Sequence, residues 1–361
     1  MKVLVFHTGS LGDTLIALPA FKSIREHFKG VHITLLSDNQ GDSGLINPKE
    51  ILKEGVFVDS FLRYNANQSG IQDKLRETFQ LAVLLRKQRF DTLIYLIRTG
   101  RPYISVLRDL VFFRIAGIKH FYGYRYASKL PSRKKLRPLP FIRHETDNLL
   151  FRLEAMGIKA NGQMPKLHDW LSEEDFECVN KWVSTLPYDG GRPWLAIGPG
   201  SKMQGKVWPK ERYFEVVKRL IYEFDIWPVV FGGQEDRMLG EYLIRQLGRG
   251  YVAAGALKVR PGIVALSRCI YYLGNDTGTM HMAVVAGIPC VAVFSARDFP
   301  GLWYPYGEGH IVIRKVLPCE GCMLETCVKQ KNKCLMDISS DEVYEACREM
   351  MNIRMKNEMV K

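Results

Sequence analysis

The sequence lacks any apolar run that is long enough to cross a lipid bilayer. Its longest nearly uncharged run, residues 282–294, has 13 residues and contains Pro289, whereas a membrane-spanning helix needs about 20 apolar residues. The first apolar run, residues 3–6, is too short for the core of a signal peptide, and Asp13 follows soon after it. We therefore expect no transmembrane helix and a protein that stays in the cytoplasm.

Two nucleotide-binding motifs are missing or incomplete. The dinucleotide fingerprint G-x-G-x-x-G is missing, which argues against a nicotinamide dehydrogenase. Residues 200–207 come close to the P-loop pattern G-x-x-x-x-G-K-[ST], but Val207 replaces the hydroxyl that holds Mg²⁺, and Trp208-Pro209 interrupts the segment that should be helical. We therefore do not expect a P-loop ATPase, although Lys206 in this glycine-rich loop is still a candidate ligand for phosphate.

Acidic residues are fewer than basic ones. The chain has 38 Asp and Glu against 51 Lys and Arg, a net charge of +13, which favours acidic partners such as nucleotides, nucleic acid or an anionic membrane surface. Part of the excess lies in residues 125–143, which contain no acidic residue and seven basic ones. These are Arg125, Lys129, Arg133, Lys134, Lys135, Arg137 and Arg143. The segment is typical of a solvated loop or of a surface for an anionic substrate or membrane, and our prediction is that it docks on anionic lipid.

The length of the chain predicts two domains. A chain of 361 residues exceeds what a single hydrophobic core usually supports. Short apolar runs alternate with helical stretches in both halves, which is typical of α/β domains with a mostly parallel sheet. A polar stretch at residues 161–166 marks the linker, so we predict an N-terminal domain over 1–170, a C-terminal domain over 171–338 and a C-terminal helix over 339–361.

Residues 269–295 combine a strand, a polar turn, a helix and a second strand. Ligands of parallel sheets bind beyond the carboxyl ends of the strands, and Asp276, Thr277 and Gly278 stand at such an end. The unbonded N–H groups and the dipole of the following helix favour an anion such as phosphate there. His281 lies one turn on and on the same face. The alternative interpretation is an ordinary capped turn.

A second loop of this kind follows the first predicted strand. It contains Gly9, Ser10, Gly12 and Asp13. The two glycines allow the backbone to approach a ligand closely, and Asp13 stands at the N-terminus of the next helix. Asp13 is therefore a helix cap or a residue of a binding site.

Four of the eight cysteines fall within sixteen residues, spaced C-x2-C-x4-C-x6-C. They are Cys319, Cys322, Cys327 and Cys334. In a cytosolic chain this spacing suggests metal thiolates before disulfides. Because the later spacing fits a zinc ribbon poorly, a structural zinc site and reduced or conditionally oxidised thiols both stay open.

These landmarks together resemble the ADP-heptose:lipopolysaccharide heptosyltransferase family, glycosyltransferase family nine. The pieces are the opening VLVFHTGSLGDTLIALPA, the loop GPGSKMQGKVWP, FGGQED, NDTGTMHMAVVAGIPCVAVF, and the cysteine segment followed by DISSDEV. The resemblance spans nearly the whole chain, and the order and spacing of the pieces make it specific. It implies an α/β protein of GT-B fold, with two Rossmann-like doubly wound domains facing a central cleft.

The resemblance also implies roles for individual residues. The N-terminal domain would bind the acceptor, with Asp13 as the catalytic base, and the C-terminal domain the nucleotide-sugar donor. The acceptor-side loop contains Gly9, Ser10 and Gly12. The donor-binding residues are Ser201, Lys206, Asp236, Asp276, Thr277, Gly278 and His281. Lys206 would contact the donor diphosphate, and Asp236 would bind the ribose.

The implied enzyme is a metal-independent inverting glycosyltransferase. Such a reaction needs a base for the acceptor proton and positive groups for the departing diphosphate. Lys206 and the N–H groups of Thr277 and Gly278 can supply the latter, so no cofactor is expected. The expected partners are ADP-heptose, an anionic lipopolysaccharide-type acceptor and the cytoplasmic face of the inner membrane, but not nucleic acid. The alternatives are a GT-B enzyme using another nucleotide sugar, a nucleotide-sugar epimerase, and a basic Cys-cluster protein that binds nucleic acid.

Overall fold

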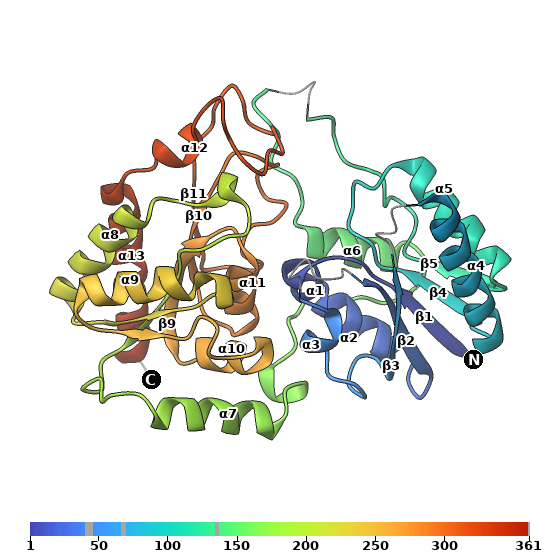
Figure 1. The fold of residues 1–361 in the computed structure, drawn as a ribbon, viewed down its shortest axis with the longest axis horizontal. Helices are drawn as coiled ribbons and strands as arrows, with labels where there is room; N and C mark the ends of the chain where they lie inside the picture. The colour runs from blue at the N-terminus through green and yellow to red at the C-terminus, as the bar shows by residue number, and fades with distance from the viewer. Residues whose placement is uncertain (40–45, 66–69, 134–136, 360–361) are drawn as a thin grey trace. The chain divides into compact units, whose positions relative to one another are not determined.

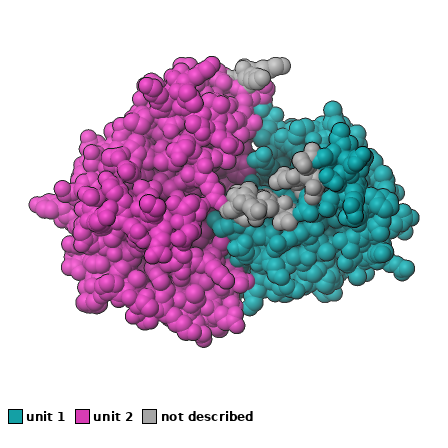
Figure 2. Space-filling view, viewed as in Figure 1, with its two compact units in different colours: residues 1–131, 145–170 teal, residues 132–144, 171–361 magenta. Residues whose placement is uncertain are grey.

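The computed structural model describes residues 1–39, 46–65, 70–133 and 137–359. The chain divides into two compact units, which Figure 2 shows in different colours. Unit 1 contains Met1–Pro131 and Glu145–Trp170, and unit 2 contains Ser132–His144 and Leu171–Lys361. Each unit is built around one parallel sheet with helices packed against it (Figure 1).

The sheet of unit 1 has five parallel strands in the order β3-β2-β1-β4-β5. The strands are β1 (Lys2–Phe6), β2 (His32–Asn39), β3 (Ser60–Asn65), β4 (Thr92–Tyr95) and β5 (His120–Tyr122). The helices are α1 (Leu11–Ile16), α2 (Leu18–His27), α3 (Pro48–Ile51), α4 (Ile71–Gln88), α5 (Tyr103–Ile115) and α6 (Glu145–Glu154). On one face of the sheet, Leu4 and Phe6 of β1 pack with Leu85 of α4 and Phe113 of α5.

The sheet of unit 2 has six parallel strands in the order β11-β10-β9-β6-β7-β8. The strands are β6 (Trp194–Gly198), β7 (Trp227–Val230), β8 (Tyr251–Val252), β9 (Cys269–Asn275), β10 (Cys290–Phe294) and β11 (Ile311–Arg314). The α-helices are α7 (Glu173–Ser184), α8 (Lys210–Phe224), α9 (Arg237–Leu247), α10 (Val259–Leu266), α11 (Gly278–Val285), α12 (Lys333–Met336) and α13 (Ser340–Met359).

Both sheets have a point at which the order of the strands reverses. In unit 1 it lies between β1 and β4, and in unit 2 between β6 and β9. In open α/β sheets, ligands bind in the crevice beyond the carboxyl ends of the strands at this point. The loops that follow β1, β6 and β9 carry the three motifs singled out in the sequence. The topology of unit 2 therefore brings the Gly200 loop and the Asp276 turn to one crevice.

One segment assignment differs from the expected boundaries. Residues 132–144, which we expected in the N-terminal domain, belong to unit 2, where Arg133 Nη2 lies 2.7 Å from Asp298 Oδ1. The C-terminal helix that we expected over 339–361 is α13, which packs against α8, β9 and β10 of unit 2. Contacts between residues as far apart in sequence as 181 positions hold residues 132–144 in place, so local propensity alone does not predict their position.

Prolines stand at the start of two helices. α1 ends at Ile16, and Pro19 stands in the first turn of α2. Pro209 is the N-cap of α8. A proline is tolerated at both positions because the first N–H groups of a helix have no intrahelical acceptor. None of the helices in the described part of the chain is both long and apolar enough to cross a membrane.

Arg152 of α6 is a charged side chain within the core of unit 1, and only 1% of it is exposed. Its guanidinium donates hydrogen bonds to the carbonyl oxygens of Tyr95 (2.9 Å), Ile97 (2.8 Å) and Gly123 (2.8 Å). Burial lowers the pKa of Arg152 to about 10, and the charge of the fully buried Glu145 opposes that shift. Arg152 therefore ties α6 to the segments that follow β4 and β5.

We expect Arg152→Met to lower the free energy of unfolding by about 3–5 kcal/mol, because it leaves the buried Glu145 carboxylate without its opposite charge. Urea unfolding followed by circular dichroism measures the change. Arg114→Met is the matched control, since Arg114 lies exposed on α5, and its loss should stay within about 0.5 kcal/mol. Equal losses for the two variants would contradict the structural role of Arg152.

Candidate functional site

Lys206 and Asp276 meet at the strand-order reversal of unit 2. Lys206 ends a short 3₁₀ helix (Gln204–Lys206) in the loop after β6, and Asp276 directly follows β9. Their side chains are 17% and 7% exposed, and Lys206 Nζ lies 2.7 Å from Asp276 Oδ2. A largely buried ion pair keeps the ammonium group in one place, because the removal of either partner leaves an uncompensated charge.

Asn275, the last residue of β9, joins the two loops and is completely buried. Its side-chain NH₂ donates to the carbonyl of Pro199 (2.7 Å) in the loop after β6. Its oxygen accepts from the backbone N–H of Trp208 (3.2 Å) and from the hydroxyl of Tyr213 (2.9 Å). Asn275 thus fixes both ends of the Lys206 loop relative to the end of β9.

Several buried polar side chains near the start of α11 are not fully hydrogen-bonded within the protein. Thr277 is the N-cap residue, but its side chain does not cap the helix. In the described part of the chain, the buried Thr277 Oγ1, Tyr272 hydroxyl, His281 Nδ1 and Ser295 Oγ have no hydrogen-bond partner of normal geometry. Such atoms cost free energy unless they are paired. Their concentration at the carboxyl ends of β9 and β10 indicates a site that a polar ligand completes.

His281 is a neutral imidazole in this site. Burial lowers its pKa to about 3, and the charges of His144 and Lys206 act in the same direction. At neutral pH the ring therefore carries one proton and adds no charge. The positive charge beside Asp276 comes from Lys206, and His281 can contribute a hydrogen bond to a ligand.

Asp236 packs against the glycines of two neighbouring loops. A Cβ at either Gly200 or Gly232 would collide with its carboxylate, so both positions require glycine for close approach. Its Oδ2 accepts the N–H of Gly233 (3.0 Å), and burial raises its pKa. Ser201 lies in the loop after the carboxyl end of β6, and its hydroxyl accepts a hydrogen bond from the N–H of Met203 (3.2 Å).

The first loop of the chain lies in unit 1 and is built around Asp13. Asp13 Oδ2 accepts the N–H (2.8 Å) and the hydroxyl (2.9 Å) of Ser10, the N-cap of α1. Gly9 has φ +146°, and a Cβ there would lie 2.5 Å from the Cβ of Asp13. Gly12 is the second residue of α1. The structure therefore makes Asp13 part of a capping box, the structural reading that the sequence left open beside a catalytic one.

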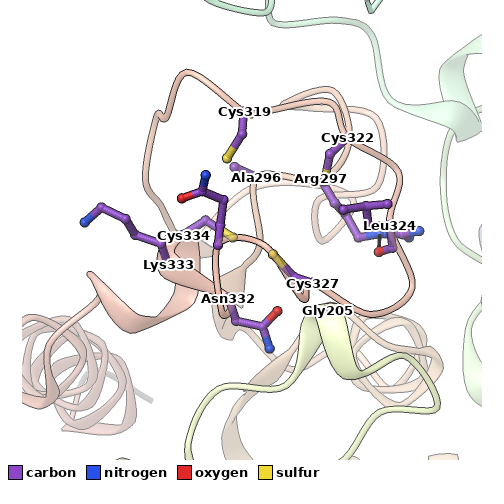
Figure 3. Close-up of a pocket in the computed structure, with 11 residues that line it drawn as sticks. Gly205, Ala296, Arg297, Cys319, Cys322, Leu324, Cys327, Asn332, Lys333 and Cys334 are labelled. Atoms are coloured by element: carbon purple, nitrogen blue, oxygen red, sulfur yellow. Dashed lines mark hydrogen bonds between the residues drawn. The ribbon is translucent and has the colours of Figure 1, made fainter.

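The segment with four cysteines supports the Lys206 loop. Figure 3 shows Cys319, Cys322, Cys327 and Cys334 around one pocket, with Gly205 at its edge. Gly205 N–H donates to the carbonyl of Glu325 (2.7 Å). Arg297 donates to the carbonyls of Met323 (2.8 Å) and Leu324 (3.0 Å). The conformation of this segment and the position of Lys206 are therefore linked.

The arrangement of these four cysteines does not fit a bound metal ion. Within the described residues, no group of three or more His, Cys, Asp or Glu side chains is placed to hold one. Burial, and then the nearby thiols of Cys319, Cys327 and Cys322, raise the pKa of Cys334. All four cysteines are unpaired thiols.

The basic segment 125–143 is divided between the two units. Its residue Arg133 pairs with Asp298 and stacks 4.7 Å from the ring of Phe299. Arg137 donates to the carbonyl of Pro318 (3.3 Å). Lys134 and Lys135 lie outside the described residues. Two of the arginines expected to contact lipid are thus engaged within unit 2.

Sequence reasoning missed the residues that hold the site together. Asn275 was part of a recognised motif but received no role, and Tyr213 and Arg297 were not considered. An Asn before Asp-Thr-Gly at a strand end is the one local signal that could have pointed to Asn275. Tyr213 and Arg297 form hydrogen bonds with residues 62 and 26 positions away, so the sequence around them does not indicate their supporting role.

The comparisons with known proteins agree on one family. The sequence profile described as glycosyltransferase family 9 (heptosyltransferase) matches residues 79–333. The chain is 23% identical over 359 residues to lipooligosaccharide heptosyltransferase 2 of Campylobacter jejuni subsp. jejuni, covering 97% of this chain and 98% of the relative.

Solved structures show the same fold. The ADP-heptose lps heptosyltransferase II of E. coli superposes with a TM-score of 0.67 at 20% identity, covering 99% of this chain and 100% of that one. The E. coli heptosyltransferase WaaC with ADP superposes with a TM-score of 0.63 at 17% identity, covering 97% and 100%. The two parallel sheets are thus those of the GT-B fold. With most of its length matched by the family profile, the chain belongs to glycosyltransferase family 9, the heptosyltransferases.

Proposed function

We propose that this chain is a metal-independent inverting glycosyltransferase that moves a heptose from ADP-heptose to a lipopolysaccharide-type acceptor. One observation supports the donor site most directly. The buried His281 Nδ1 in the first turn of α11 has no hydrogen-bond partner, the cap hydroxyl Thr277 Oγ1 has none of normal geometry, and Asp276 just before them holds the Lys206 ammonium group. A diphosphate would satisfy such donors and the positive charge together. The names of the similar proteins supply the sugar and the acceptor.

The test of this function is a panel of nucleotide sugars. We expect ADP-heptose at about 100 times its Kd to stabilise the protein by roughly 2.7 kcal/mol, since ligand that binds only the native state adds RT ln(1 + [L]/Kd). In a unit of about 200 residues this raises Tm by roughly 5–10 °C. UDP- and GDP-linked sugars at the same concentration are the controls. An equal or larger shift in Tm with a UDP- or GDP-linked sugar would contradict ADP-heptose as the donor. It would not contradict membership of the glycosyltransferase family.

Asp13 and Lys206 receive different tasks in this proposal. The acceptor hydroxyl loses its proton to Asp13 as it attacks the anomeric carbon, and the bond from that carbon to the diphosphate oxygen breaks. Because Ser10 occupies Oδ2, the proton goes to Oδ1 of Asp13. Lys206 and the N–H groups at the start of α11 stabilise the negative charge of the departing ADP. Asp276 positions Lys206, and Asp236 is the proposed ribose ligand.

Variants of these two residues should fail differently. Asp13→Asn keeps a hydrogen-bond acceptor for the Ser10 cap but cannot take a proton, so kcat should fall by about 10²–10⁴ with little change in donor affinity. Lys206→Ala should weaken donor binding by roughly 1.5–3 kcal/mol, since it removes a charged hydrogen bond. Calorimetry and steady-state kinetics separate the two effects.

Unit 2 offers a matched control for the helix cap. Asp175 Oδ2 accepts the N–H and the hydroxyl of Ser172, each at 2.9 Å, in the same arrangement as Asp13 and Ser10. Asp175→Asn should therefore change stability but leave kcat near the wild-type value. If Asp13→Asn behaved like Asp175→Asn, Asp13 would be a cap only and the base would lie elsewhere.

Transfer should also persist in EDTA. In this proposal, Lys206 and backbone N–H groups take the role that Mg²⁺ has in metal-dependent enzymes, which hold it with one or two carboxylates and the substrate phosphates. The measurement is the initial rate with and without EDTA, with circular dichroism as a control for folding. A loss of rate that Mg²⁺ restores, at constant ellipticity, would show that a metal takes part.

We further propose that the enzyme works in the cytoplasm and contacts the inner membrane surface peripherally. The net charge of +13 and the family's lipid-linked acceptors support this placement. Nucleic acid is not among the proposed partners, because the crevice of unit 2 is shaped by a buried ion pair and an imidazole rather than by a basic surface with aromatic stacking residues.

A further inference from the structure

The outward faces of α4 and α5 in unit 1 are apolar, where a surface helix normally carries polar side chains. The exposed apolar residues recur every three or four positions, so those of each helix form one stripe. On α4 these residues are Ile71, Leu75, Phe79 and Val83. On α5 they are Ile104, Leu107, Val111 and Ile115. Phe79 is 70% exposed and Ile104 is 80% exposed, so the two stripes are separate from the core beneath them.

The two stripes lie on neighbouring helices of unit 1. α4 packs against α5, and the two helices lie side by side in unit 1 (Figure 1). Beside the stripe of α5, a groove runs between this helix and residues 124–129, lined by Tyr103, Leu107, Tyr126 and Lys129 among others. We call the two stripes and this groove the α4–α5 face. An apolar surface of this extent marks a site of interaction with a partner or a membrane.

Basic residues are concentrated in the same part of the chain. Residues 71–131 contain twelve Lys and Arg against four Asp and Glu, a net charge of +8 out of +13 for the whole chain. One of the four acids, Asp109, is neutralised within the face by Arg101 (2.8 Å) and Arg108 (2.7 Å). An apolar stripe flanked by positive charge is the pattern of a helix that lies in the interface of an anionic bilayer.

We propose that the α4–α5 face docks the protein on an anionic lipid bilayer. The apolar stripes enter the boundary between headgroups and acyl chains, and the surrounding Lys and Arg contact the headgroups. α5 has 13 residues, about 20 Å at 1.5 Å per residue, so it lies on the membrane and does not span it. The inference rests on the proposed function, since a lipid-linked acceptor requires the enzyme to work at a bilayer.

The charge of the face favours a bilayer over a second copy of the chain. A twofold dimer would place the same patch against itself, so two regions of net charge +8 would repel each other. Residues 132–143 of the basic segment are the weaker candidate for lipid, because Arg133 and Arg137 are engaged with Asp298 and Pro318 of unit 2. We therefore place the docking surface on the α4–α5 face, which includes Arg125 and Lys129 of that segment.

The test is sedimentation of the full chain with large vesicles, comparing phosphatidylcholine alone with phosphatidylcholine containing roughly one third phosphatidylglycerol. Wild-type protein should sediment with the anionic vesicles, and less so as the salt concentration rises. The quadruple variant Ile104→Ser, Leu107→Ser, Val111→Ser and Ile115→Ser should bind about tenfold more weakly, because it removes apolar area that enters the interface. These side chains are exposed, so thermal unfolding should stay close to that of the wild type.

Two control variants test whether vesicle binding depends on the α4–α5 face or on other exposed residues. The first replaces four exposed apolar side chains of unit 2 by serine: Tyr222, Met238, Val316 and Val328. The second replaces Arg133 and Arg137 of the basic segment by serine. Both should bind vesicles as the wild type does. Wild-type binding by the α5 variant, or no binding of the wild type to any vesicle, would overturn the proposal. So would a dimer in lipid-free solution, seen by light scattering, that the α5 variant abolishes.

A transfer assay keeps this proposal separate from the proposed function. With a delipidated, water-soluble acceptor the α5 variant should turn over like the wild type, whereas with an acceptor embedded in vesicles its rate should fall about tenfold, in step with its binding. If the wild type transferred heptose to neither acceptor, the proposed function would fail while the sedimentation result still decided the docking surface. Equal rates of variant and wild type on the embedded acceptor would contradict the docking role.

Discussion

The crevice of unit 2 depends on the buried amide of Asn275. A buried amide that lost its partners would cost about 1–3 kcal/mol, and here both its oxygen and its nitrogen are bonded to groups of the loop after β6 and the helix that follows. Because these bonds need one geometry, the end of β9 and the Lys206 loop cannot move independently. The 2.7 Å contact between Lys206 and Asp276 is possible only because the two loops are already aligned.

The support of this crevice extends to the segment with four cysteines. The backbone of Gly205 is bonded to Glu325, and Asn332 donates to the carbonyl of Gln204 (3.0 Å). A Cβ at Gly205 would lie 2.9 Å from the carbonyl oxygen of Leu324, so glycine is needed for this approach. Residues of this segment therefore support the backbone of the loop that carries Lys206. Support of the Lys206 loop explains why four cysteines without metal-binding geometry lie next to that loop.

The sequence was sufficient for most of the architecture, because apolar runs and turn residues are local signals. The alternation of strands and helices predicted two parallel α/β units, and the family resemblance predicted the GT-B fold that the solved structures share. The errors arise where distant contacts overrule the local pattern. Residues 132–144 continue a loop of the first half, but the ion pair of Arg133 with Asp298 places them in unit 2.

For the candidate site, the sequence motifs identified the residues but not their ion pairs or their protonation states. The pattern Asp-Thr-Gly-x-x-His does not show that Lys206 pairs with Asp276 or that burial keeps His281 neutral. Both depend on which atoms surround the group, and these atoms come from residues that are far apart in the sequence, such as His144 and Lys206 around His281. The same holds for Asp13, because the sequence does not show that its Oδ2 accepts both the N–H and the hydroxyl of Ser10.

Net charge illustrates the same distinction between composition and location. Of the chain's many arginines, Arg152 and Arg297 are buried and bonded to backbone carbonyls, so they add to the formal charge without forming part of a basic surface. Arg133 likewise serves as a tether within unit 2. A count of Lys and Arg over residues 125–143 therefore includes side chains that are engaged within the protein, such as Arg133 and Arg137. A surface attracts such a partner only where the charges are exposed and, for a bilayer, where exposed apolar side chains accompany them. On unit 1 that combination occurs along α4 and α5.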